Sequence, residues 1–243
     1  MSAKPGKAKL NGASNKVFRP AWTTLCSPSD CSNHSPMNTP THMLISAGLL
    51  TRPGDRFVNI AAVLGGLTPD IPMFVMFGWS RFVLGLSDSQ VWGEVYWREP
   101  WQTAVAASHS FPLHLALLLI AYWLRLRWLS VYAIAVLLHA GVDFLVHRED
   151  AHAHFWPLVN WKFISPVSYW DRNHYGNVVG LIEMGIAGAM IVILWRRFKS
   201  IWVRLGLGLA LISYVALPIY FLAMPHHHGP EASSHQVETT NAQ

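Results

Sequence analysis

The sequence predicts an all-α protein, a polytopic bundle of transmembrane helices, and three observations lead to this fold class. Of the 243 residues, 52% are apolar and only 13% are charged, against about 25% charged in an average soluble domain. The mean hydropathy is positive, at +0.27. The apolar residues also gather into stretches long enough to cross a hydrocarbon core, which takes about 20 helical residues. This pattern argues against a disordered chain and against a typical soluble enzyme.

Five stretches have the length of a membrane span, and a sixth is shorter. Tryptophans such as Trp79, Trp101 and Trp123 flank them, as expected of side chains that lie at the two membrane interfaces. We therefore expect about five to six membrane segments. The long stretches are 57–80, 104–124, 128–147, 177–195 and 205–224, and the short one is 41–51.

Polar tails are predicted on both sides of this region, which divides the chain into three parts. A disordered basic tail covers 1–36, a transmembrane helical domain covers 37–224, and a second disordered tail covers 225–243. Both cysteines, Cys26 and Cys31, lie in the first tail, so the helical domain can have neither a disulfide nor a cysteine-ligated metal. Because the composition changes at Met37, a translation start at either Met1 or Met37 fits the sequence.

The net charge of +5 does not indicate a nucleic-acid partner. Residues 1–36 contribute +4 and residues 37–243 only +1, so the helical domain has no basic face for phosphates. The short connections carry Arg125, Arg127 and Arg197, and the positive-inside rule places them in the cytoplasm. The long connections, 81–103 and 148–176, are then outside. The basic N-terminal tail agrees with this orientation only if segment 41–51 re-enters the membrane instead of spanning it.

Asp70 lies in an apolar stretch between Pro69 and Pro72. Prolines interrupt a helix and free backbone carbonyls, and an ionised carboxylate there is costly unless it is paired or metal-bound. Asp70 is therefore either a metal ligand or a helix N-cap. His42 and Asp70 are expected about 15 Å and 21 Å from the same turn at 1.5 Å per residue. They should lie at similar depth, where His42 is either a ligand or a core histidine.

His139, Asp143 and His147 form the strongest pattern, since they are spaced four residues apart along one predicted helix. Residues at this spacing share one helix face, about one turn apart. Imidazole and carboxylate are ligands of zinc, iron and manganese, so we expect a divalent metal, with zinc favoured over iron or manganese. The alternative is a hydrogen-bonded polar pair in the core without a metal.

Three further residues are candidates for catalytic roles: His109, Ser110 and Glu183. His109 and Ser110 lie near the start of the stretch 104–124, on the side of the membrane where the stretch 128–147 ends. Glu183 lies in an apolar stretch, where a carboxylate indicates a functional site by default. We expect His109 or Glu183 to move protons and Ser110 to position substrate; a helix-pairing role is the alternative for Glu183. All candidates are expected in the outer half of the bilayer. The expected metal ligands are His42, Asp70, His139, Asp143 and His147.

The order of these motifs resembles a known family. Thr41-His42, the GGLTPD of Gly65–Asp70, the SHS of Ser108–Ser110 and the HxxxD of His139 and Asp143 are similar to the predicted membrane-bound, metal-dependent hydrolases. This family includes the LexA-regulated inner-membrane protein YdjM. The resemblance covers residues 37–185 and implies a metal-dependent hydrolase of the bacterial inner membrane.

A second likeness is to small alphaproteobacterial membrane proteins labelled cobalamin biosynthesis CobQ. It rests on the segments 38–42 (NTPTH), 154–158 (HFWPL) and 165–171 (SPVSYWD). A CobQ-type amidotransferase is soluble and uses a cysteine nucleophile, and residues 37–224 contain no cysteine, so that activity is not expected here. The linear order His, Asp, His, HxxxD is also similar to zinc-dependent phospholipase C.

Two functions are compatible with these features. The first is a membrane-embedded metal-dependent hydrolase that acts on a lipid, a phosphoester or another amphiphile at the outer interface, where the site is expected. The second is a non-enzymatic membrane protein, either a metal binder or transporter or a helical scaffold. Transport needs polar residues in both halves of the bilayer, whereas the inner half is apolar apart from its arginine turns. The lipid bilayer is the expected partner in both cases, and nucleic acid in neither.

Overall fold

The computed structural model describes residues 39–223, which contain helices and irregular segments and no β-strand. The all-α class is therefore confirmed for this part of the chain. The predicted tails, 1–36 and 225–243, and the candidate start at Met37 lie outside the described residues. The longer helices are α1 (Thr39–Leu50), α2 (Arg56–Leu67), α3 (Ile71–Gly78), α5 (Glu99–Ser108), α6 (Phe111–Trp123), α7 (Arg127–Val146), α8 (Gly176–Arg197) and α9 (Ile201–Ala223). Short elements are η3 (Thr68–Asp70), η4 (Trp79–Val83), α4 (Asp88–Gln90), η5 (Val91–Val95) and η6 (Arg172–His174).

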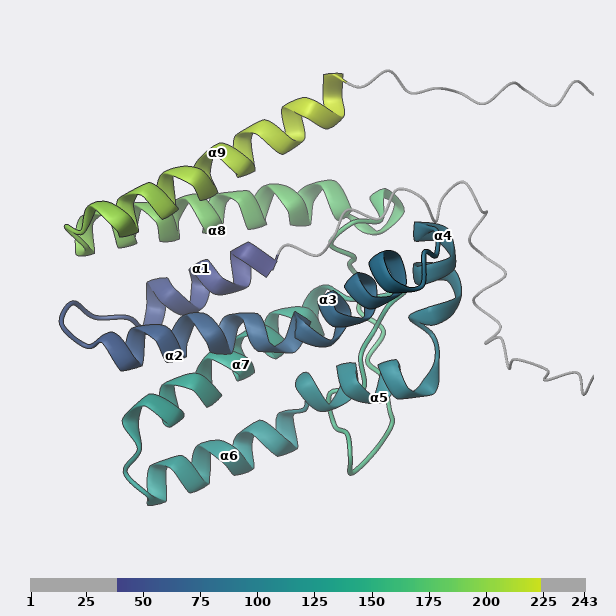
Figure 1. Cartoon of the computed structure of the whole chain (residues 1–243), viewed down its shortest axis with the longest axis horizontal. Helices are drawn as coiled ribbons and strands as arrows, with labels where there is room; N and C mark the ends of the chain where they lie inside the picture. Colours follow the sequence, from purple (N-terminus) through teal and green to yellow (C-terminus); the bar gives the residue numbers. More distant parts are fainter. Residues whose placement is uncertain (1–38, 224–243) are drawn as a thin grey trace, which may run out of the picture.

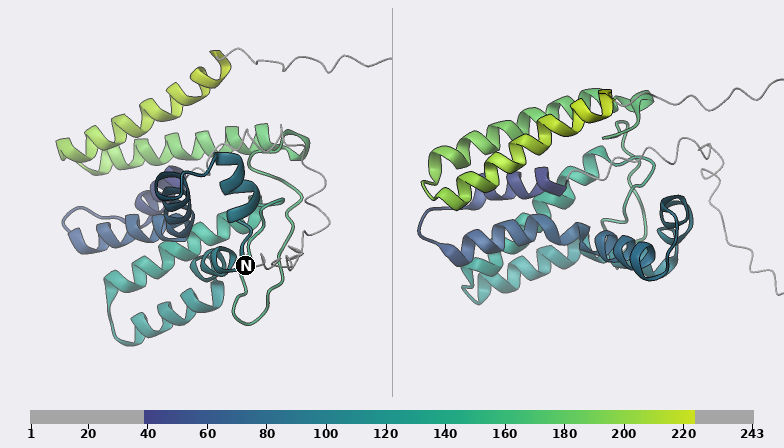
Figure 2. Two further views of the ribbon diagram at one scale, coloured as in Figure 1. Left: turned by 45° about the vertical axis from the view of Figure 1, so that its right-hand side comes forward. Right: turned by 45° about the horizontal axis from the view of Figure 1, so that its top comes forward.

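The turns α1–α2, α6–α7 and α8–α9 lie at one end of the helices, and the 147–175 connection and α4 lie at the other (Figures 1 and 2). The basic residues of the short turns therefore gather at one end. There Arg197 of α8 donates hydrogen bonds to the carbonyls of Gly48 and Thr51, at 2.8 and 2.9 Å. Gly48 lies in the last turn of α1 and Thr51 directly follows the helix, where carbonyls lack helical partners. The guanidinium therefore joins α8 to the end of α1.

Three helical segments among the described residues are long and apolar enough to cross a membrane: Arg56–Val83, Arg127–Val146 and Gly176–Arg197. A fourth exists if α5 and α6, which are bent by 40° relative to each other, form one broken span. The expectation of five to six membrane segments is therefore too high. α1 has only 12 residues, about 18 Å of helix, and Ile201–Tyr214 of α9 is a shorter apolar helix.

The break between α5 and α6 has a local cause. Ser110 has an extended backbone and its side chain accepts a hydrogen bond from the Leu113 amide, while Pro112 follows in the first turn of α6. This is an N-cap arrangement that starts a new helix. The predicted stretch 104–124 therefore divides into two helices, with His109 between them.

The Asp70 region changes from α-helix to the 3₁₀ turn η3 because Pro69 has no N–H to continue the α-helical pattern. Two carbonyls of this stretch accept side-chain hydrogen bonds. The Gly66 carbonyl accepts from His139 Nδ1 at 2.8 Å, and the Pro69 carbonyl accepts from Ser108 Oγ at 2.9 Å. The proline-containing break thus supplies acceptors that hold neighbouring helices in place.

Two adjacent glycines of α2 allow three helices to approach closely. A Cβ atom on Gly65 would lie 2.5 Å from the Tyr132 carbonyl oxygen of α7, and one on Gly66 would lie 2.9 Å from the His42 carbonyl oxygen of α1. Small residues at helix contacts permit this kind of approach. As a result, the rings of His42 and His139 stack with their centroids 3.8 Å apart.

We expect Gly66→Ala to lower the stability of the protein by about 1–3 kcal/mol, because the added methyl group would meet the His42 carbonyl and Ser46 Oγ, both at 2.9 Å. The matched control is Gly185→Ala in α8, where a Cβ meets nothing within 4 Å. The control should be neutral or slightly stabilising, since alanine favours helix over glycine. Thermal unfolding in mild detergent makes the comparison, and equal losses in the two variants would contradict the close contact at Gly66.

Candidate functional site

Six of the predicted residues form one buried cluster, although they come from four parts of the chain. His42 lies on α1, Asp70 in η3, His109 between α5 and α6, and the remaining three at the end of α7. All six side chains are buried. The end of α7 leads directly into the long connection, away from the short turns (Figure 1). The six residues are His42, Asp70, His109, His139, Asp143 and His147.

Asp143 is the centre of this cluster, because four imidazole Nε2 atoms face its carboxylate. Oδ2 lies 3.0 Å from His139 Nε2 and 3.1 Å from His109 Nε2. Oδ1 lies 3.2 Å from His42 Nε2 and 3.5 Å from His147 Nε2. The carboxylate is inaccessible to solvent, so these rings are its main source of compensation for the loss of hydration.

The tautomers of two of these histidines follow from their other nitrogen. His139 Nδ1 lies 2.8 Å from the Gly66 carbonyl and His109 Nδ1 lies 2.9 Å from the Val105 carbonyl. A carbonyl only accepts, so each Nδ1 carries a proton. In the neutral ring, Nε2 then presents a lone pair to Asp143 Oδ2. Lone pair and carboxylate repel each other unless a cation, either a proton or a metal ion, lies between them. A histidine held through its far nitrogen in this way is typical of metal ligands.

Asp70 is oriented toward the same place. Thr39 Oγ1 donates a hydrogen bond to Oδ2 at 2.5 Å, while Oδ1 has no hydrogen-bond partner and lies 3.6 Å from His139 Nε2. Asp70 does precede α3, but its side chain makes no capping hydrogen bond. The helix-cap alternative therefore does not explain the residue, and its free oxygen points to the cluster.

Two groups of side chains could hold a metal ion here, and Asp143 belongs to both. One consists of Asp70, His109, His139 and Asp143, and the other of Asp143, His147 and His152; within each group the ligand atoms lie within 4.8 Å of one another. Two ligands at about 2.1 Å from a tetrahedral ion lie about 3.4 Å apart. The separations of 3.0–3.6 Å between Nε2 atoms and carboxylate oxygens agree with this spacing.

His152 and His154 extend the cluster, although the sequence predicted no role for them. Each is buried with an Nε2 atom that has no hydrogen-bond partner. Burial lowers the pKa of His152 well below its ordinary value, and the neighbouring His109 and His147 lower it further. The same burial effect lowers the pKa of His154 to about 4. Both rings are therefore neutral at pH 7. An HxH pattern directly after the α7 histidines was the only sequence signal for them.

His147 is held differently, because a carboxylate and not a backbone carbonyl lies next to its Nδ1 atom. Nδ1 lies 2.9 Å from Asp150 Oδ1, and Tyr169 donates a hydrogen bond to Asp150 Oδ2 at 3.3 Å. Burial alone would lower the pKa of His147, but the carboxylates of Asp150 and Asp143 outweigh it and raise the pKa well above its ordinary value. His147 Nε2 is thereby directed toward Asp143.

The structure places the three predicted catalytic residues in three different settings. His109 lies within the ligand group described above. The Ser110 hydroxyl donates to the Trp156 carbonyl and accepts from the Leu113 amide, so it caps α6 and holds the loop after His154. Glu183 is half-buried on α8 and belongs to none of the described groups that could hold a metal.

A third group, Glu149, Asp171 and His174, lies half-buried in the long connection. His174 Nδ1 contacts Asp171 Oδ2 at 2.5 Å, and Ser168 Oγ donates to Glu149 Oε2 at 3.1 Å. Arg148 also lies 3.6 Å from Glu149. These polar groups satisfy one another, which explains the arrangement without a metal.

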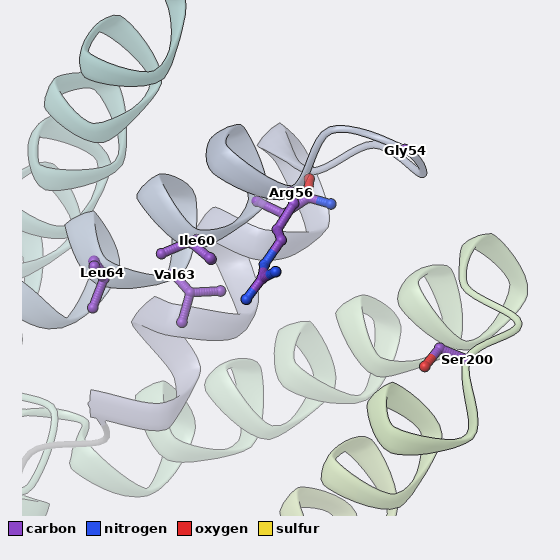
Figure 3. A pocket seen from close by; sticks show the side chains of 7 residues that line it. Gly54, Arg56, Ile60, Val63, Leu64 and Ser200 are labelled. Carbon is purple, nitrogen blue, oxygen red and sulfur yellow. The ribbon is translucent and has the colours of Figure 1, made fainter.

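A surface hollow lies at the opposite end of the helices (Figure 3). It measures about 680 Å³ and its lining includes Arg56, Ile60, Leu64 and Ser200. None of the cluster residues lines it. The candidate site is thus a buried constellation near the long connections and is separate from this hollow.

The lowered pKa of His154 predicts an acid-sensitive fold. An unfolded chain binds the proton at a pKa of about 6.5, whereas folded His154 binds it at about 4. Stability is therefore lost as the pH falls from 6.5 to 4, because the unfolded state binds more protons in this range. In EDTA and mild detergent, His154→Gln should reduce this loss by about 1–3 kcal/mol. Between pH 7.5 and 8.5 the difference between the two proteins should be constant; parallel profiles down to pH 4 would contradict the prediction.

No family model, no curated protein and no solved structure matches this chain. Its function therefore has to be inferred from the buried cluster itself.

Proposed function

We propose that this protein is a membrane-embedded, metal-dependent hydrolase that acts on a lipid or a phosphoester at the outer interface of its membrane. The observation that carries this proposal is the surroundings of Asp143. Its buried carboxylate faces four Nε2 atoms within 3.5 Å, and two of these rings are held by a carbonyl at Nδ1. These properties favour a site that binds a cation over a set of polar residues in an apolar core.

The residues that would hold the metal are His109, His139, Asp70 and Asp143, with His147 and His152 beside them. This nitrogen and oxygen donor set suits zinc, with iron or manganese as alternatives. A bound ion of this type supplies Lewis acidity and lowers the pKa of a coordinated water to about 7. Because the cluster is inaccessible to bulk solvent, charges that develop during hydrolysis are weakly screened there.

His154 Nε2 is the atom we assign to proton transfer. The ring of His154 lies 6.0 Å from that of His109 and 5.9 Å from that of His152, measured between centroids. Its Nδ1 donates to the His152 carbonyl at 3.1 Å, which leaves Nε2 as a free base beside the ligands. His109 is less suited to this task, since both of its nitrogens are engaged.

The segment after His154 favours an amphiphilic substrate. It exposes apolar side chains outside the spanning helices, with Leu158 77% and Trp161 53% exposed. It is also tied to the cluster, because the Phe111 amide donates to the His154 carbonyl at 2.8 Å. Exposed apolar and tryptophan side chains of this kind are suited to a membrane interface. A substrate that enters beside this segment would meet His154 first.

The first experiment measures metal and hydrolysis together. The full chain in mild detergent should bind zinc, iron or manganese and hydrolyse a phosphoester. The double variant His139→Ala/Asp143→Ala should lose the metal, and hydrolysis should fall by about 100-fold or more. The control is Ser130→Ala on the same helix, whose hydroxyl only bonds the Leu126 carbonyl.

Two outcomes would contradict the proposed function. Unchanged metal content in a folded double variant would exclude the cluster as the binding site. Stoichiometric metal without hydrolysis of lipid or water-soluble phosphoesters would instead favour the alternative function, a metal binder or transporter.

The apolar segment generates a separate prediction on substrate class. Leu158→Ser/Trp161→Ser should raise KM for a phospholipid in vesicles about 10-fold while kcat is unchanged, because insertion into the interface contributes to binding and not to chemistry. Both side chains are exposed, so the fold should tolerate the change. Arg172→Ser, an exposed change in the same connection, is the control. An equal rise in KM for a water-soluble phosphoester would contradict a role at the membrane.

A further inference from the structure

We propose that Asp143 bridges two metal ions, one bound to each of its carboxylate oxygens. This inference rests on the metal-dependent function proposed above and adds the nuclearity of the centre. Asp143 is the residue that the two ligand groups share.

The Oδ2 side of Asp143 forms the first half of the centre. His139 Nε2 and His109 Nε2 lie 3.0 and 3.1 Å from Oδ2. Asp70 contributes an oxygen to the same group, and its Oδ1 atom is buried without a hydrogen-bond partner. Two imidazoles and two carboxylates would thus surround the first ion.

The Oδ1 side forms the second half with different residues. His147 Nε2 lies 3.5 Å from Oδ1, and His152 completes this group with an Nε2 atom that is buried and without a partner. His42 Nε2 approaches Oδ1 at 3.2 Å. Oδ1 itself has no hydrogen-bond partner despite these neighbours. No histidine is shared between the two oxygens, so each side of the carboxylate has its own donors.

Each half also has its own orienting contacts, of the kind that histidine ligands use at their second nitrogen. On the Oδ2 side, backbone carbonyls hold the Nδ1 atoms of His139 and His109. On the Oδ1 side, Asp150 lies 2.9 Å from His147 Nδ1, and Tyr169 holds Asp150 in turn. Asp150 is therefore a positioning residue for the second ion. Paired ions about 3.5–4 Å apart are typical of hydrolases that act on phosphoesters.

The test uses the full chain, stripped with chelator and then loaded with Zn²⁺ or with Mn²⁺. Elemental analysis should find two Zn²⁺ per chain in the wild type and in the Ser130→Ala control. His109→Ala, on the Oδ2 side, and His152→Ala, on the Oδ1 side, should each retain one. In the Mn²⁺ form, electron paramagnetic resonance should show exchange coupling between two ions. Asp143→Asn should abolish this coupling.

Asp150→Asn provides the test of the positioning residue. It should weaken binding of one ion about 10- to 100-fold and leave the other unchanged, because loss of a partner that orients a ligand histidine has effects of this size. Asp88→Asn, an exposed acid that pairs with Arg81, is the control and should change neither affinity. An equal loss of affinity for both ions would contradict the assignment of Asp150 to one side of the carboxylate.

The outcomes separate this inference from the proposed function. One ion per wild-type chain together with metal-dependent hydrolysis would overturn the bridge and leave the function standing. Two uncoupled ions in the wild type would also overturn it. No ion would overturn both proposals. The coupling measurement on the wild type needs no variant, so the test does not depend on whether a ligand substitution folds.

Discussion

The rest of the structure depends on the burial of one carboxylate. Asp143 is inaccessible to solvent inside an apolar helical bundle, where an uncompensated negative charge costs several kcal/mol. Compensation has to come from cations or from donors aimed at its two oxygens. The chain meets this demand with four imidazoles that reach the carboxylate from α1, α7 and the segments that follow α5 and α7. Most of the close helix packing can be understood as the arrangement that brings these rings together.

Breaks in regular structure make that arrangement possible. Gly65 and Gly66 remove the side chains that would separate α2 from α7 and α1, and the 3₁₀ turn at Pro69 presents carbonyls to Ser108 and to the helix α7. The chain also leaves helical geometry between α5 and α6, which places His109 at the carboxylate. Each irregularity would weaken an isolated helix, and each is used to position or to hold a residue of the cluster.

The two ends of the molecule have different chemistry. One end gathers arginines in short turns, and Arg197 secures the end of α1 there. The other end carries the long connection, whose His152 and His154 face the cluster while Leu158 and Trp161 are exposed. Under the proposed function, a buried polar centre below exposed apolar side chains would suit an amphiphilic substrate. The separation also explains why the surface hollow near Arg56 has no relation to the cluster.

The sequence by itself determined the helical class, the apolar runs and the alignment of His139, Asp143 and His147, because hydropathy and the 3.6-residue period are local properties. The distances of His42 and Asp70 from their shared turn, at about 1.5 Å per helical residue, also predicted that the two residues lie at similar depth. Only the tertiary structure decided the number of helices long enough to span, since the cap at Ser110 and the brevity of α1 depend on chain geometry. It alone identified Asp143 as the centre, added His152 and His154 to the cluster, and left Glu183 outside the described groups that could hold a metal. These are contacts between distant segments, which follow from how helices pack and not from spacing along the chain.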